Sequence, residues 1–168
     1  MSLVKITYLP AESDRQLLRQ IARWTRDEWI RDGSEATLDR LEALFAERAG
    51  SRELPLMVIA QDSSDPRDGQ GGLVGFASLV ASEMKRARPT LGPWLSGVYV
   101  RPESRGRGVG AELCRRIADE ARRLGASEAY LYTRDQQALY TSLGWSVFSE
   151  EYHEGAWVTI MRLTLSRG

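Results

Sequence analysis

Hydrophobic positions along the chain follow two spacings, which predicts a fold that mixes strands and helices. Alternating or continuous apolar runs predict strands at residues 3–8, 56–60, 73–81, 94–100 and 128–133, and at about 145–152 and 156–165. Apolar residues at helical spacing predict helices from Ser13 to about Arg31, from Thr37 to Gly50, along 109–124 and from Asp135 to Gly144. The polar stretch at 61–72, rich in glycine, predicts the turn of a hairpin.

The order of these elements indicates the fold class. Helices alternate with strands in the middle of the chain, and hairpins lie on either side. This order predicts an α/β fold in which a mixed sheet is flanked by about four helices. One parallel connection is expected, from strand 94–100 through the long helix to strand 128–133. The chain shows no repeat, low-complexity segment or linker, so we expect a single domain over residues 1–168.

Composition and charge exclude several classes of partner. The chain is 42% hydrophobic and 27% charged, and its 23 basic residues balance 23 acidic ones. Such a balance provides no overall field to attract nucleic acid or an anionic membrane. No apolar run approaches the roughly 18 residues of a membrane span, and the single cysteine, Cys114, allows no intramolecular disulfide. We therefore expect a cytoplasmic protein with neither nucleic-acid nor membrane partners.

The stretch RPESRGRGVGAEL, residues 101–113, stands between a predicted strand and the long helix. A plain surface turn would explain one of its glycines but not three. A nucleic-acid arm would need more basic charge and interleaved aromatic residues. A P-loop is excluded because no glycine here is followed by Lys-Ser or Lys-Thr.

A dinucleotide site and another kind of pyrophosphate site are the remaining interpretations. Gly106, Gly108 and Ala111 fit G-x-G-x-x-G/A, and Glu128 lies near the offset of a ribose-binding acid. Four residues separate the strand from the first glycine, however, and Glu128 begins its strand instead of ending it. Consecutive N–H groups at a helix start also bind anions, and glycines let phosphates approach the backbone.

The pattern Arg105-x-x-Gly108-x-Gly110 resembles the signature of the GNAT superfamily of N-acetyltransferases, and ALYTSLGW (138–145) resembles its second motif. The resemblance implies a GNAT-like fold that binds acetyl-CoA as co-substrate, with strand 94–100 splayed from strand 128–133. It implies that an N–H near Val98 polarises the thioester carbonyl. Thr133 stands where many members carry an asparagine. The expected donor-binding residues are Val98, Tyr99, Val100, Arg105, Gly106, Arg107, Gly108, Val109, Gly110, Thr133 and Gln136.

The implied reaction is direct attack of a primary amine on the thioester in a ternary complex. The leaving thiolate, with a pKa of roughly 8.5, gains from a nearby proton donor, and a tyrosine supplies one with a pKa of about 10. By its motif Tyr140 is the expected donor, with packing in the core as the alternative role. An alkyl amine with a pKa of about 10 must also lose a proton before it attacks.

The base is open between Glu28, Glu83 and a relay of water molecules, and solvated carboxylates are the alternative interpretation of both acids. Trp94 stands where some members of the family place a glutamate. His153 is expected at the surface and Cys114 in the core, and with one histidine and one cysteine we expect no metal site.

Two alternative functions remain, a non-catalytic sensor of acyl-CoA and a transferase that uses a longer acyl-CoA. The acceptor is expected to be a small-molecule amine or a peptide amine, and a homodimer, common in the family, is left open. Trp24, Trp29 and Trp94 are candidates to line the acceptor pocket, and Trp94 could offer its ring to a cation. Core packing is the alternative, and we expect it for Trp29, Trp145 and Trp157.

Overall fold

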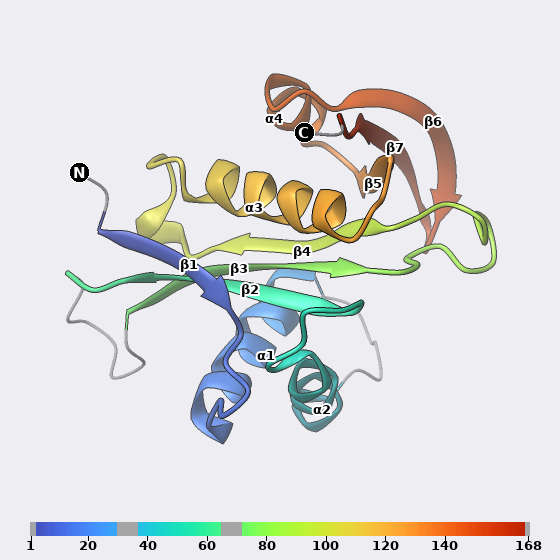
Figure 1. The fold of residues 1–168 in the computed structure, drawn as a ribbon. Coiled ribbons are helices and arrows are strands. Elements are labelled where there is room, and N and C mark those ends of the chain that lie inside the picture. Colours follow the sequence, from blue (N-terminus) through green and yellow to red (C-terminus); the bar gives the residue numbers. More distant parts are fainter. Residues whose placement is uncertain (1–2, 30–36, 65–71, 167–168) are drawn as a thin grey trace.

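The computed structural model describes residues 3–29, 37–64 and 72–166, which form seven strands and four α-helices around one sheet (Figure 1). The elements are β1 (Val4–Tyr8), α1 (Arg15–Trp29), α2 (Leu38–Arg48), β2 (Leu56–Asp62), β3 (Leu73–Val80), β4 (Trp94–Val100), a short 3₁₀ turn (Pro102–Ser104), α3 (Val109–Arg123), β5 (Glu128–Thr133), α4 (Gln137–Ser142), β6 (Ser146–His153) and β7 (Ala156–Thr164). The predicted α/β class and its mixed sheet are confirmed.

The sheet has the strand order β1-β2-β3-β4-β5-β7-β6, and helices lie against both faces of its central strands (Figure 1). Helix α3 lies on one face, and its predicted apolar stripe of Val109, Leu113, Ile117 and Ala121 is buried against β2, β3 and β4. Helices α1 and α2 lie on the other face, where Ile21 and Phe45 pack against the side chains of β2 and β3. This burial of two opposite faces is the main source of stability expected for such a layered sheet.

Strands β4 and β5 run parallel but separate almost at once. Trp94 pairs with Tyr130, and the N–H of Tyr130 donates to the carbonyl of Pro93 at 2.9 Å, but no later residue of β4 pairs with β5 in the described part of the chain. The register of β4 against β3 also shifts beside Gly97, whose φ of 60° belongs to the left-handed region. The shift is a β-bulge, which bends a strand locally. The splay that the family resemblance implies is therefore present.

The helix boundaries correct two predicted caps. Asp14, and not Ser13, caps α1, because its Oδ1 accepts the N–H of Leu17 at 2.8 Å while the Ser13 hydroxyl donates to the carbonyl of Pro10. Thr37 caps α2 as predicted, accepting the N–H of Arg40.

Asp135 does not cap α4. The cap position of α4 is Gln136, and no side chain there bonds to the helix. The last predicted turn of α1, to Arg31, lies outside the described residues.

The burial of each tryptophan depends on whether another element packs against it, which sequence periodicity does not reveal. Trp145 is buried as predicted, but Trp29 and Trp157 are 47% and 67% exposed, so the prediction of core packing for both is wrong. Trp29 ends α1 and meets only the edge of Tyr99, while Trp157 lies on β7 of the last hairpin. Trp94 is fully buried, and its indole N–H donates to the carbonyl of Leu91, so its ring is not free to meet a cation.

Candidate active site

The glycine loop, residues 105–110, leads from the end of β4 into α3 with its backbone open to solvent. Gly106 and Gly108 have φ values of 77° and 81°, and a Cβ added at either would meet no described atom within 4 Å. Gly108 occupies the cap position of α3 without a side-chain bond, so the first N–H groups of the helix face outward. Exposed donors at the positive end of a helix dipole form an anion site.

Arg105 folds back over the end of β4. Its Nε donates to the carbonyl of Val100 at 2.8 Å, and its guanidinium lies 5.8 Å from the centre of the Tyr99 ring. Its Nη2 is 3.9 Å from a carboxylate oxygen of Glu28, on the last turn of α1. The side chain remains half exposed, so it is accessible to a ligand. The structure thus brings Glu28, Tyr99, Val100 and Arg105 together.

Arg107 is anchored on an acid that the sequence analysis missed. Its Nη2 lies 3.2 Å from Oδ2 of Asp62, whose side chain is 3% exposed at the end of β2. The hydroxyl and the N–H of Ser64 also donate to Asp62, and these bonds together with Arg107 lower the pKa of the Asp62 carboxyl. Asp62 ends β2, two residues beyond the strand predicted at 56–60, and nothing in the sequence indicated its distant partner Arg107. Asp62 fixes the loop to β2.

Tyr140, on α4, packs against α3 near Cys114. It packs into the core cluster of α3, and its ring meets the ring of Trp145 at 6.3 Å. Burial raises the pKa of Tyr140, and the thiol of Cys114, on α3, raises it further. The hydroxyl has no hydrogen-bond partner among the residues described, so Tyr140 is a protonated phenol whose donor is unused in this structure. The packing of Tyr140 in the core is therefore observed, and its role as a proton donor stays a prediction.

Cys114 is buried as expected, and burial raises the pKa of its thiol to about 12. The thiolate needed for nucleophilic catalysis is thus disfavoured. In the part of the chain that the structure describes, no three His, Cys, Asp or Glu residues gather as metal ligands. No described helix is long and apolar enough to cross a membrane.

The other expected donor-site residues lie at two places, on β4 and at the turn into α4. Val98 follows the bulge at Gly97 and is half-buried. Thr133 is buried, and its Oγ1 accepts the N–H of Gln136, whose own side chain is exposed. Thr133 therefore stabilises the turn into α4.

Glu83, Tyr132 and His153 form a separate polar cluster, here called the Glu83 cluster. It lies on the face of the sheet covered by α1 and α2, at the end of β4 opposite the glycine loop. Glu83 follows β3 half-buried, and its charge acts on Tyr132 and Arg48. Burial raises the pKa of Tyr132 to about 12, and Glu83 with Glu154 adds to the effect. The two candidate bases are thus separated, because Glu28 lies beside the glycine loop.

His153 belongs to the Glu83 cluster. It lies at the hairpin turn as predicted but is only partly exposed, since its side chain is 20% exposed and its ring packs edge-on against Tyr132 at 5.1 Å. The contact arises because β6 and β7 place the turn of the last hairpin beside β5, which the linear order conceals.

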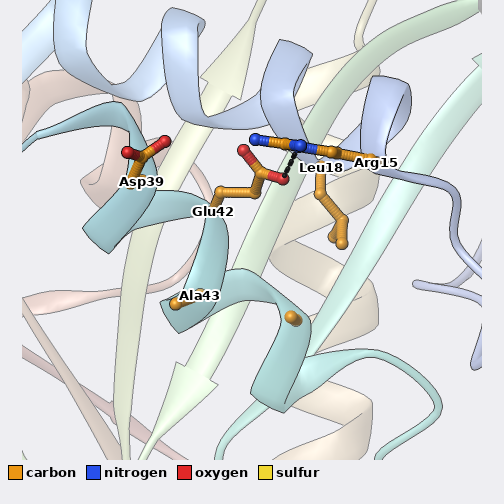
Figure 2. Close-up of a pocket in the computed structure, with 6 residues that line it drawn as sticks. Arg15, Leu18, Asp39, Glu42 and Ala43 are labelled. Carbon is orange, nitrogen blue, oxygen red and sulfur yellow. Dashed lines mark hydrogen bonds and ion pairs between the residues drawn. The ribbon is translucent and has the colours of Figure 1, made fainter.

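A hollow between α1 and α2 is separate from the glycine loop and from the Glu83 cluster. It is lined by Arg15, Leu18, Asp39, Glu42, Ala43 and Ala46. Figure 2 shows Arg15 reaching across it to Glu42, at 3.0 Å. Its charges are paired across the two helices, and no residue of the glycine loop or of β4 lines it. We assign it a structural role in joining α1 to α2.

Comparison with known proteins agrees with this geometry. The family model described as the acetyltransferase (GNAT) family matches residues 18–145, and the chain belongs to that family. No curated protein matches the chain in sequence.

Solved structures of similar fold share little sequence with the chain. An aminoglycoside 6'-N-acetyltransferase complexed with coenzyme A has a TM-score of 0.71 at 14% identity, over 96% of this chain and 97% of the other. The putative acetyltransferase yncA from Salmonella typhimurium, with acetyl-CoA, has a TM-score of 0.68 at 20% identity, over 99% and 96%. A variant of spermidine N-acetyltransferase from Vibrio cholerae has a TM-score of 0.69 at 18% identity, over 98% and 95%.

Proposed function

We propose that this protein is an acetyl-CoA-dependent N-acetyltransferase that moves the acetyl group directly to a primary amine in a ternary complex. The observation that carries the proposal is the glycine loop, with Gly106 and Gly108 exposing backbone N–H groups at the start of α3 beside the splayed end of β4. Membership of the family and the acetyl-CoA or coenzyme A in the similar structures support the same donor.

In this proposal each part of the donor meets a group of the protein suited to it. The N–H groups of residues 105–110 bind the pyrophosphate, and Arg105 and Arg107 add positive charge from their fixed positions. The pantetheine arm lies along β4 from Val98 to Val100, where β5 has turned away. The N–H of Val98, just after the bulge, donates to the thioester oxygen as negative charge develops on it.

The chemical step needs two proton movements. The amine nitrogen attacks the thioester carbon, the carbon–sulfur bond breaks, and the amine loses a proton to a base. Tyr140 donates a proton to the departing thiolate, a role supported by its motif and by its buried, protonated phenol next to α3. Glu83 is the better candidate base, because it lies at the end of β4 opposite the glycine loop and therefore away from the donor's pyrophosphate. Glu28 lies beside the loop and faces Arg105.

The experiment that tests the proposal measures thiol release from acetyl-CoA with a panel of primary amines and identifies the product by mass. Release that depends on an amine, with an N-acetyl product, is expected. Tight binding of coenzyme A without release for any amine or any acyl chain would instead indicate a sensor. Faster release from longer acyl-CoA donors would overturn acetyl specificity and leave the transferase class intact.

A further inference from the structure

Arg48, the last residue of α2, carries a charge that the described residues do not neutralise directly. Its Nη1 donates to the hydroxyl of Ser78 at 2.9 Å, and its guanidinium lies 5.5 Å from the centre of the Phe45 ring. Its Nε is buried and donates to no acceptor among the residues described. Glu83 and Glu47 act on it only through space, and burial lowers the pKa of Arg48. A buried guanidinium in this state is costly without an anion.

Ser82 provides a second buried polar atom on the neighbouring segment. Its Oγ has no hydrogen-bond partner within the described part of the chain. Ser82 lies between Ser78, which bonds to Arg48, and Glu83, whose charge acts on Arg48. Buried polar atoms without partners are rare in native proteins. One of these two belongs to Arg48, and the other lies on the segment between its partner Ser78 and Glu83, so together they point to a polar ligand.

The position of Arg48 relates this pair of atoms to the proposed reaction. Ser78 of β3 pairs with Ser96 of β4, and cross-strand partners lie side by side. Ser96 directly precedes Gly97, whose bulge places Val98 at the proposed thioester site. Arg48 is therefore tied, through Ser78, to the residue next to the proposed point of acetyl transfer, on the face opposite α3.

We propose that the acceptor is an amine that also carries a carboxylate, such as a free amino acid, and that Arg48 with the hydroxyl of Ser82 binds this carboxylate. This inference rests on the proposed function. A guanidinium can hold both oxygens of a carboxylate, which would give the buried Nε its acceptor. In this inference Glu83, the next residue along the chain and close enough for its charge to act on Arg48, is the negative partner of the amine end. An acceptor that is only cationic would instead meet the charge of Arg48.

The test compares amino acids with their own primary amides, which keep the shape and lose the negative charge. Acetylation of β-alanine, 4-aminobutyrate, L-leucine and L-phenylalanine is measured beside that of the four amides, for the wild type and for Arg48→Gln. We expect the ratio of kcat/KM for acid over amide to fall about 10- to 100-fold in Arg48→Gln. The change should lie mainly in KM of the acceptor. Comparing ratios removes the effect of different amine pKa values.

Two further variants keep the test sharp. Arg40→Gln makes the same substitution at an exposed position of α2 and should leave the ratio unchanged. Ser82→Ala removes one hydroxyl and should lower the same ratio by a smaller factor, which retains a readout if Arg48→Gln does not fold. An equal ratio in Arg48→Gln and wild type would overturn the inference. Spermidine, assayed beside the acids and amides as a purely cationic amine, would also overturn it if it were preferred over every amino acid.

Failure of the proposed function is recognised separately. If no amine releases thiol, Tm is measured with coenzyme A present and each amino acid or amide added at millimolar concentration. A rise with the acids alone that is lost in Arg48→Gln would support the carboxylate site in a protein without turnover. No rise, or an equal rise with the amides, would overturn it.

Discussion

The Nε atom of Arg105 donates to the carbonyl oxygen of Val100 at 2.8 Å, so the first side chain of the glycine loop is fastened to the last residue of β4. Arg107 makes the equivalent link to Asp62 at the end of β2. The loop that exposes its backbone is therefore held from two strands. Fixed donors of this kind bind an anion without first having to be ordered.

Arg105→Ala should weaken the binding of coenzyme A by about 10-fold, since it removes one charged donor and the link to β4. The affinity is measured by calorimetry, with Arg115→Ala as the control because Arg115 is exposed on α3 and forms an ion pair with Glu112. Equal affinities in the two variants would show that Arg105 acts on neither the loop nor the donor.

Gly108→Ala should lose affinity for coenzyme A beyond its effect on stability. The φ of 81° costs an alanine about 1–2 kcal/mol, and the added methyl occupies the open side where phosphate would approach. Gly125→Ala is a matched control, because Gly125 has a φ of 85° and the same open surroundings at the far end of α3. Both variants should show a similar fall in Tm, and only Gly108→Ala should bind coenzyme A less tightly.

Tyr140→Phe should lower kcat by about 100-fold and leave the affinity for acetyl-CoA almost unchanged, because it removes a proton donor and keeps the packing. Single-turnover kinetics and calorimetry measure the two quantities. Tyr130→Phe removes a phenol that donates to Glu128 on β5, and it should change neither quantity. Wild-type turnover in Tyr140→Phe would assign the residue to the core alone.

Glu83→Gln and Glu28→Gln should separate the two candidate bases. If Glu83 takes the proton, Glu83→Gln lowers kcat by about 100-fold and removes the acidic limb of the pH–rate profile. Glu28→Gln should change chiefly KM for acetyl-CoA, because Glu28 lies 3.9 Å from Arg105. The reverse pattern would exchange the two roles.

Glu120 should contribute stability that disappears in acid. Burial alone would raise the pKa of Glu120, but hydrogen bonds from Tyr8, Arg123 and Arg116 outweigh it and hold the pKa below its usual value. A lowered pKa stabilises the fold above the unfolded value of about 4.3, and this contribution is lost as the pH falls through the folded pKa.

Glu120→Gln should therefore lower the free energy of unfolding by about 2 kcal/mol at pH 7, and the difference from wild type should shrink toward pH 3. Denaturant unfolding at several pH values measures it, and Glu112→Gln, at an exposed ion pair, should have little effect at any pH. A difference that stays constant with pH would mean that packing, and not charge, stabilises this position.

The sequence predicted the elements and the glycine loop because their signals are local. The stripe from Val109 to Ala121 and the glycines before it depend only on spacing within one segment. Asp14 caps α1 in place of Ser13 because the Ser13 hydroxyl donates to the carbonyl of Pro10, and sequence alone does not choose between two adjacent capping residues. Asp62 and Arg48 could not be assigned in advance, since their partners Arg107 and Ser78 come from distant segments that only the folded sheet brings close.

The single residue pair between β4 and β5 has a consequence for how the protein responds to its donor. The sheet consists of two antiparallel parts, β1 to β4 and β5-β7-β6. One residue pair joins them, and both pack against α3. In the proposed complex the pantetheine arm supplies the missing edge of both, so the co-substrate completes the architecture as an additional strand would. Saturation with acetyl-CoA should then restrict the movement of the two parts of the sheet relative to each other, because the bound arm contacts the edges of both β4 and β5.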